Sequence, residues 1–206
     1  MRTMRSVHAG VLAVCLSVAC APAGATLRNE PLASQSIRAV VDAARGQVNV
    51  TTIYDPTYVR LSYPGGDVPL ERGVCTDVVI RAFRAAGVDL QQAVHEDMRR
   101  SFRSYPKRWG LSRPDPNIDH RRVPNLMVYF DRQGKSVAIG PDSSEYLAGD
   151  LVTWDLGGGV PHIGVVTADV DPASGRRLIV HNIGQGAKLE DVLFAWKITG
   201  HYRYFT

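Results

Sequence analysis

Three residues that can support nucleophilic catalysis occur in this chain, namely Cys75, His162 and His181. Cys75 lies at the predicted start of a helix, within the segment ERGVCTDVVIRAF (71–83). Free backbone N–H groups and the positive end of the helix dipole favour a thiolate there, so the position predicts a lowered pKa for the thiol. A cysteine nucleophile also needs a base within hydrogen-bond reach and a group that orients the base.

The two histidines lie where they can supply the base and its partner. His162 follows the turn GGGVP and begins a predicted strand, and His181 lies in the next strand. If the two strands form a hairpin, the imidazoles become neighbours on one face. Each histidine could instead satisfy a loop carbonyl. Asn182 is a rival for the orienting role, although strand alternation sends it to the opposite face. His120, on a proline-flanked loop, is a further candidate base.

Charged residues near these positions have two readings each. Asp77, in the first helical turn, either complements the helix dipole or binds an amine or arginine of a substrate. Arg121 and Arg122 suit a carboxylate ligand, because guanidinium binds carboxylate bidentately. The alternative is a structural ion-pair cluster with Asp115 and Asp119. The sequence has no cysteine pair or closely spaced histidine pair, so we expect neither a metal nor another cofactor.

The first residues predict export. A basic start is followed by an apolar run (9–21) and by Ala23-Gly24-Ala25, which is the pattern of a secretory signal peptide of residues 1–25. The alternative is a lipoprotein signal with anchoring at Cys20, although Ser17 is unusual at its position. The remaining residues 26–206 are long enough for a single domain. We therefore expect a periplasmic or secreted protein with no stable membrane insertion after removal of the signal.

After loss of this leader one cysteine remains, which is unusual for an exported chain. The unpaired thiol of Cys75 is then a buried apolar group, an intermolecular disulfide partner or a nucleophile. The leader contains two of the 24 basic residues and none of the 20 acidic ones, so the mature net charge is about +2. That charge is too small and too scattered to predict a nucleic-acid partner.

Hydrophobic periodicity predicts helices first and a sheet second. Helices are expected at 32–45, from Cys75 to the residue before Gly87, at 89–103 and at 125–132. Strands are expected at 150–155, 162–168, 178–183 and 195–204. This order predicts an α+β fold with N-terminal helices packed on a C-terminal antiparallel sheet.

Five motifs in a fixed order resemble the NlpC-type cell-wall cysteine peptidases of the papain-like superfamily. They are Tyr63-Pro-Gly-Gly, Gly73-Val-Cys75-Thr-Asp, Gly149-Asp-Leu-Val-Thr-Trp154, Pro161-His162-Ile-Gly-Val-Val and Leu178-Ile-Val-His181. More narrowly, segments 109–111, 119–126 and 181–184 resemble domain-of-unknown-function family 1287, a secreted bacterial branch. The likeness covers about residues 33–205. Two departures are Val74 and Thr76-Asp77 around the cysteine, where Asp-Cys-Ser-Gly is usual, and a longer insert at 89–140.

The resemblance implies a papain-like fold with Cys75 as nucleophile, His162 as base and His181 as the orienting residue. It also implies the backbone N–H of Cys75 and the hydroxyl of Tyr63 as oxyanion donors. We therefore expect an exported cysteine hydrolase that cleaves amide bonds in peptidoglycan stem peptides through an acyl-thioester. Asp77 and Asn182 are expected to support the site, and Arg121, Arg122, His120 and Trp154 to contact the substrate.

Two other functions fit the same fold. One is an acyltransferase or lipid hydrolase, which an apolar channel beside Cys75 would favour. The other is a non-catalytic cell-wall binding domain, in which Cys75 would lack activation. An activated thiolate is expected to react with iodoacetamide near neutral pH much faster than an ordinary cysteine.

Overall fold

The computed structural model describes residues 32–206. The predicted signal peptide and the alternative lipid anchor at Cys20 lie outside the described residues. Within the described part, the order of elements is helical first and mainly β afterwards, as predicted from the sequence. The described residues form one compact unit.

The four α-helices of the described residues confirm the predicted ones within a few residues. They are α1 (Leu32–Arg45), α2 (Cys75–Ala85), α3 (Leu90–Ser101) and α4 (Val123–Arg132). The start of α3 is capped by Asp89, whose side chain accepts a hydrogen bond from the backbone N–H of Gln91. Pro124 lies in the first turn of α4, where its missing N–H costs nothing. Single 3₁₀ turns cover Phe102–Ser104, Asp119–Arg121 and Ser143–Glu145.

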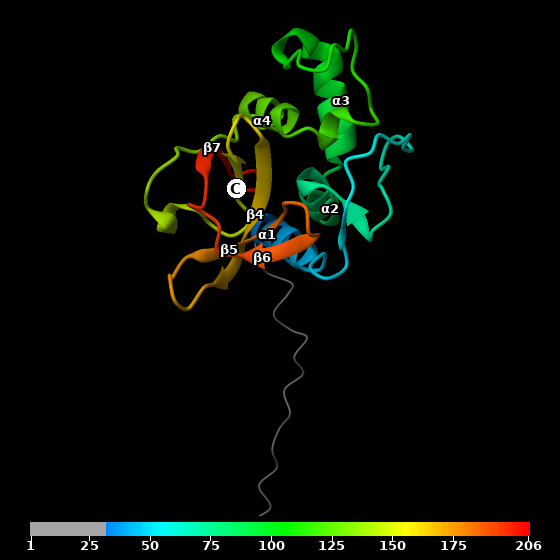
Figure 1. The fold of residues 1–206 in the computed structure, drawn as a ribbon. Coiled ribbons are helices and arrows are strands. Elements are labelled where there is room, and N and C mark those ends of the chain that lie inside the picture. The colour runs from blue at the N-terminus through cyan, green and yellow to red at the C-terminus, as the bar shows by residue number, and fades with distance from the viewer. Residues whose placement is uncertain (1–31) are drawn as a thin grey trace, which may run out of the picture. The chain divides into compact units, whose positions relative to one another are not determined.

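A five-stranded antiparallel sheet follows, with the spatial order β6-β5-β4-β3-β7 (Figure 1). Its strands are β3 (Leu151–Asp155), β4 (Pro161–Val170), β5 (Arg177–Asn182), β6 (Ala187–Glu190) and β7 (Lys197–Tyr202). β6 was not predicted, and the last predicted strand is shorter than expected. A separate parallel pair joins β1 (Ile53–Tyr54) to β2 (Arg72–Gly73).

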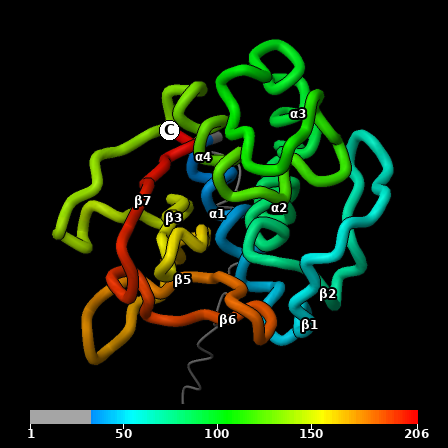
Figure 2. Tube along the Cα trace, turned by 45° about the horizontal axis from the view of Figure 1, so that its top comes forward, coloured from blue at the N-terminus to red at the C-terminus, as the bar shows by residue number. Residues whose placement is uncertain are grey.

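The two faces of the sheet are buried differently. Helices α1, α2 and α4 pack on the face that includes Leu151, Ile163 and Val180, and α2 lies between the sheet and the β1–β2 pair (Figure 2). The other face is covered by a smaller apolar cluster that includes Trp154 and Leu193. These features confirm a mixed α+β fold.

Trp154 does not occupy the position expected of a substrate contact. Its side chain is fully buried, and its indole Nε1 donates a hydrogen bond to the carbonyl of Leu193 (3.0 Å). Alternation along a strand does not show which face of the sheet a large aromatic side chain occupies. Here Trp154 packs in the smaller apolar cluster, on the face away from the helices. Among residues 32–206, no helix is both long enough and apolar enough to cross a bilayer.

Candidate active site

The start of α2 is fixed by a buried ion pair. Asp77, in the first turn, accepts the backbone N–H of Val74 (2.7 Å) and is held by Arg121 through Nε and Nη2, both at 2.9 Å. Both side chains are 2% exposed. The carboxylate therefore caps the helix and neutralises Arg121, so it does not bind a substrate amine.

Arg121 links this helix start to an earlier segment of the chain. Besides Asp77, its guanidinium donates to the carbonyls of Asp55 (3.1 Å) and Thr57 (3.1 Å). Of the two readings left open by the sequence, the structure shows the ion pair, although the partner is Asp77 rather than Asp115 or Asp119. Arg121 also lines the pocket beside Cys75, but its guanidinium is bound to Asp77 and to two backbone carbonyls rather than left free for a substrate carboxylate.

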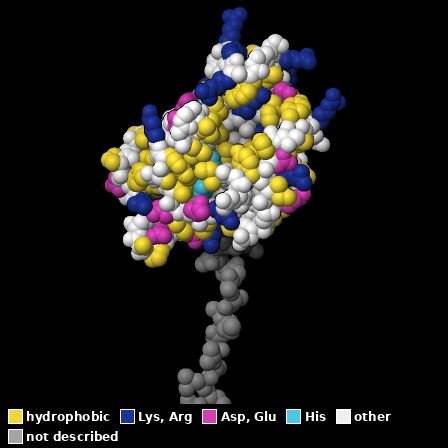
Figure 3. All heavy atoms as spheres, in the orientation of Figure 1, with side chains coloured by type: hydrophobic (Ala, Val, Ile, Leu, Met, Phe, Trp, Pro, Cys, Tyr) yellow, Lys and Arg dark blue, Asp and Glu magenta, His cyan; other side chains and the backbone are white. Residues whose placement is uncertain are grey.

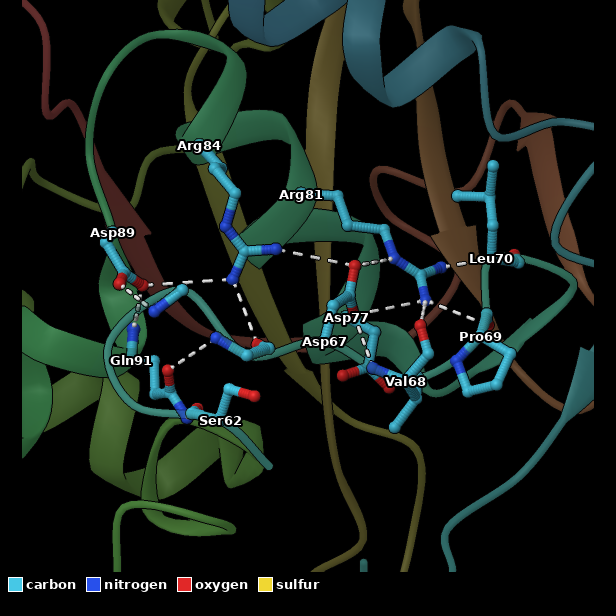
Figure 4. Close-up of polar contacts among 12 residues, drawn as sticks. Ser62, Asp67, Val68, Pro69, Leu70, Asp77, Arg81, Arg84, Asp89 and Gln91 are labelled. Atoms are coloured by element: carbon cyan, nitrogen blue, oxygen red, sulfur yellow. Dashed lines mark hydrogen bonds and ion pairs between the residues drawn. The ribbon is translucent and has the colours of Figure 1, made fainter. Parts of the chain in front are cut away.

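A second arginine fastens the loop that leads into the helix. Figure 4 shows Arg81 of α2 pointing into the loop before β2, where Nε reaches Asp67 (2.9 Å) and Nη2 reaches the carbonyls of Val68 (3.2 Å) and Pro69 (3.3 Å). Buried carbonyls that would otherwise lack partners are satisfied in this way. Arg81 thus fixes the loop that precedes Cys75 to the helix that Cys75 begins.

The two histidines are joined directly. β4 and β5 pair antiparallel with Gly164 opposite His181, which confirms the predicted hairpin. His162 Nε2 lies 2.9 Å from His181 Nδ1, and His181 Nε2 lies 2.9 Å from Glu190 Oε2 on β6. A Cβ at Gly164 would approach Ile179 to 2.6 Å, so glycine permits the close approach of the two strands here.

These contacts fix one direction for the hydrogen bonds. An ionised Glu190 only accepts, so Nε2 of His181 carries the proton and its Nδ1 accepts. His162 then carries its proton on Nε2, and its Nδ1 has a free lone pair. Burial lowers the pKa of both histidines, for His162 to about 3 with His181 adding to the effect, so both rings are neutral at pH 7. This arrangement fixes the tautomer and the orientation of the His162 ring.

Cys75 contacts the strand that carries His162. The backbone N–H of Ile163, the residue after His162, donates a hydrogen bond to its sulfur and lowers its pKa. Burial has the larger and opposite effect, because Cys75 is only 6% exposed, and the pKa of the thiol rises to about 12. The sequence prediction of a lowered pKa was therefore wrong: the apolar surroundings outweigh the helix dipole.

This raised pKa changes the expected result with iodoacetamide. At pH 7 the folded protein is expected to react more slowly than a free cysteine, with the rate rising steeply at alkaline pH and on unfolding. Following incorporation by mass spectrometry across a pH series checks this. Fast labelling of the folded protein at neutral pH would contradict the buried thiol, and slow labelling no longer distinguishes a binding domain from an enzyme.

A pocket of about 190 Å³ opens beside Cys75. Its walls are mainly apolar and include Val74, Ile118, Val123 and Pro161, the residue before His162. The cysteine and the start of the histidine strand therefore border one cavity.

A tyrosine other than the predicted one lies at this pocket. Tyr63 is 42% exposed, its ring packs against His95 at 5.1 Å, and it does not line the pocket. Tyr54 on β1 does line it, and the pKa of Tyr54 is raised by burial and then by Cys75. Of the two tyrosines, Tyr54 rather than the predicted Tyr63 therefore lines the cavity beside Cys75.

Of the two remaining predicted substrate contacts, Arg122 lies at the pocket and His120 does not. Arg122 lines the pocket, pairs with Asp119 (3.3 Å) and lies 4.1 Å from the ring centroid of Trp109. His120 is 2% exposed and away from the pocket lining, and burial together with Arg121 lowers its pKa to about 3. This burial corrects its expected roles as base or substrate contact.

Asn182 supports the cysteine from the opposite side of β5. Its Nδ2 donates to the carbonyl of Gly73 (3.0 Å), two residues before Cys75, while the neighbouring His181 contacts His162. Alternation along the strand thus separates the two roles, as expected. Within residues 32–206, no group of three or more histidine, cysteine, aspartate or glutamate side chains is arranged to hold a metal ion.

Comparison with known proteins places all of these residues within one family. The sequence profile of the family described as "Domain of unknown function (DUF1287)" matches residues 41–204. The chain belongs to this family. The DUF1287 chain is also 58% identical over 167 residues to "Uncharacterized protein YijF" of Escherichia coli strain K12, with 81% of each chain covered.

Two residues of the DUF1287 site were missed in the sequence. The sequence did not indicate Glu190, because its short strand, AKLE, lacks the apolar alternation that predicts the other strands. Tyr54 lies in a two-residue strand within a proline-rich stretch, and such a strand has no sequence signal. Tyr54 is positioned by pairing of β1 with β2, and Glu190 by pairing of β6 with the neighbouring β5.

Proposed function

We propose that this protein is an exported, papain-like cysteine hydrolase of the NlpC type that cleaves amide bonds in peptidoglycan stem peptides. The observation that carries the proposal is the hydrogen-bonded series His162–His181–Glu190, whose first member lies on β4 next to Ile163, the residue whose N–H binds the sulfur of Cys75. A neutral base with a fixed tautomer on the strand that contacts the thiol supports acyl transfer to sulfur.

In the proposed first step, the thiol proton moves to Nδ1 of His162 while sulfur attacks the amide carbon. The electron pair of the C=O bond moves to oxygen, and the new oxyanion accepts hydrogen bonds from the Cys75 N–H and the Tyr54 hydroxyl. Because the resting thiol has a raised pKa, proton transfer accompanies the attack rather than preceding it. His181 and Glu190 stabilise the imidazolium that forms.

In the next steps the proton of His162 passes to the leaving amine as the C–N bond breaks, which leaves a thioester on Cys75. Water then attacks the thioester carbon, with His162 again taking a proton, and the carboxylic acid leaves as the C–S bond breaks. The thiol is restored with no net change in the enzyme. Of the residues used in these steps, His162, His181 and Glu190 are already joined by hydrogen bonds, and the steps as written need no cofactor.

Digestion of muropeptides tests the proposal. The processed protein, as purified from expressing cells, is incubated with a mixture of muropeptides, and the products are identified by mass. We expect fragments whose masses correspond to the addition of water across one stem-peptide amide bond. No change in any muropeptide, with the protein folded, would contradict the substrate assignment.

Substitution of Glu190→Gln tests the orienting series. The amide is nearly isosteric, but its NH₂ group can present a donor to Nε2 of His181 and favour the wrong tautomers. We expect amide cleavage to fall about 100-fold or more, by analogy with the loss of an orienting acid in other triads. Stability should change little, because Glu190 is 48% exposed on its side chain. Retention of full activity in this variant would remove Glu190 from the mechanism.

The apolar walls of the pocket favour one alternative in the same fold, an acyltransferase or lipid hydrolase. The thioester would then be formed from an acyl ester and passed to another acceptor. Incubation with a phospholipid in place of muropeptides distinguishes the two, because only the alternative predicts release of fatty acid or a lysolipid by the Cys75-containing protein.

A further inference from the structure

The basic charge of this protein is concentrated in one segment. Residues 96–113, here called the basic segment, hold six basic and two acidic residues, a net charge of +4 that equals the net charge of the whole chain. The basic and acidic residues in the rest of the chain are therefore equal in number. The six basic residues are Arg99, Arg100, Arg103, Lys107, Arg108 and Arg113, and all six are exposed.

The basic segment forms one end of the described molecule. It runs from the second half of α3 through the 3₁₀ turn and into the following loop. Figure 3, in the orientation of Figure 1, shows dark blue side chains projecting from the end that α3 and this loop occupy. The charges of the basic segment are therefore gathered at one end of the described molecule.

Little of this charge is neutralised locally. Asp97 is 4% exposed and is already bound by Arg132 (2.6 Å) and by the hydroxyl of Tyr105 (2.7 Å). Of the six basic side chains, only Arg100 comes within 4 Å of the carboxylate of a described residue, Asp97 at 3.8 Å, and its side chain is 66% exposed. The basic side chains are thus exposed and available to bind an external anion, because they form almost no ion pairs within the described residues.

An exposed tryptophan lies among these cations. Trp109 is 39% exposed, follows Arg108 directly, and packs its ring against Arg122 at the Cys75 pocket. Tryptophan partitions to the boundary between water and lipid headgroups, and clustered arginines bind anionic headgroups. Nucleic acid would fit the charge alone, but the export predicted by residues 1–25 separates the protein from it.

We propose that the basic segment is a docking surface for an anionic phospholipid bilayer, with Trp109 at the interface. The binding is peripheral and electrostatic. Because Trp109 also lines the Cys75 pocket, docking brings that pocket next to the membrane surface. This inference does not depend on the proposed hydrolase activity.

Sedimentation with vesicles tests the docking. The processed protein is expected to bind vesicles that contain phosphatidylglycerol, to bind pure phosphatidylcholine much more weakly, and to dissociate as salt is raised. The triple variant Arg100→Ala, Arg103→Ala, Arg108→Ala should bind roughly 100-fold more weakly, since each charge near the surface contributes about fivefold. The control Arg45→Ala, Arg177→Ala, Lys197→Ala removes equal charge elsewhere and should bind nearly normally.

A second variant reports on the tryptophan separately. Binding to phosphatidylglycerol vesicles is expected to shift the fluorescence emission to the blue, and Trp109→Ala should lose this shift. The other two tryptophans lie outside the basic segment: Trp154 is buried in the sheet, and Trp196 packs against the rings of His162 and His181. Circular dichroism checks that each variant is folded. Equal losses in the two triple variants, no preference for phosphatidylglycerol, or binding to an oligonucleotide but not to vesicles would each overturn the proposal.

Discussion

Substitution of Cys75 with alanine is expected to abolish amide cleavage, with a loss of about 10⁵-fold or more in kcat. The sulfur is the only atom in the proposed mechanism that bonds to the substrate, so no neighbouring group replaces it. The fold should persist, because alanine fits the first turn of α2 and the capping carboxylate of Asp77 remains in place. Cys75→Ser should be nearly as inactive, since a hydroxyl is a much poorer nucleophile at this site.

The measurement is product formation from muropeptides by each variant, followed by mass and compared at equal concentrations of folded protein. Arg177→Ala, at the far end of β5 from His181, is a suitable control and should retain full activity. Turnover by Cys75→Ala at more than a trace of the original rate would exclude a covalent mechanism. Loss of activity in both the variant and the control would instead indicate a general effect on folding.

The sequence was most informative where a residue's role depends on its own segment. The helix at 32–45 follows from apolar spacing and boundary residues, and the one predicted at 125–132 is found two residues longer at its start. The β4–β5 hairpin follows from two alternating runs separated by turn residues. The pairing of His162 with His181 follows from that hairpin alone. These features are local, and local chemistry determines them.

The sequence was misleading where distant segments compete with local effects. The position of Cys75 at a helix start lowers its pKa, but packing of α2 on β4 buries the thiol and raises it. Asp77 and Arg121 are 44 residues apart, and no pattern along the chain joins them. Burial and long-range pairing decide these two cases, and neither is encoded in residue spacing. Glu190 differs, because it is nine residues from His181 and was missed for the weak apolar alternation of β6.

Arg121→Ala is expected to have the largest effect on stability, a loss of about 3–5 kcal/mol in the free energy of unfolding. The substitution leaves the carboxylate of Asp77 buried without its partner, and it also leaves the carbonyls of Asp55 and Thr57 without their donors. Because the segment from 55 to 57 follows Tyr54 directly, the variant should also loosen the Tyr54 side of the pocket. Denaturant unfolding at pH 7 measures the loss.

A double-mutant cycle separates the ion pair from the other contacts of Arg121. Asp77→Ala combined with Arg121→Ala should be less destabilised than the sum of the two single variants, because the double variant buries no uncompensated charge. Arg113→Ala, which removes an exposed arginine from the neighbouring loop, should change stability by less than about 0.5 kcal/mol. Additive effects of the two buried substitutions would show that Arg121 acts mainly through the backbone carbonyls. The buried pair would then have no separate part in fixing the helix start that presents Cys75.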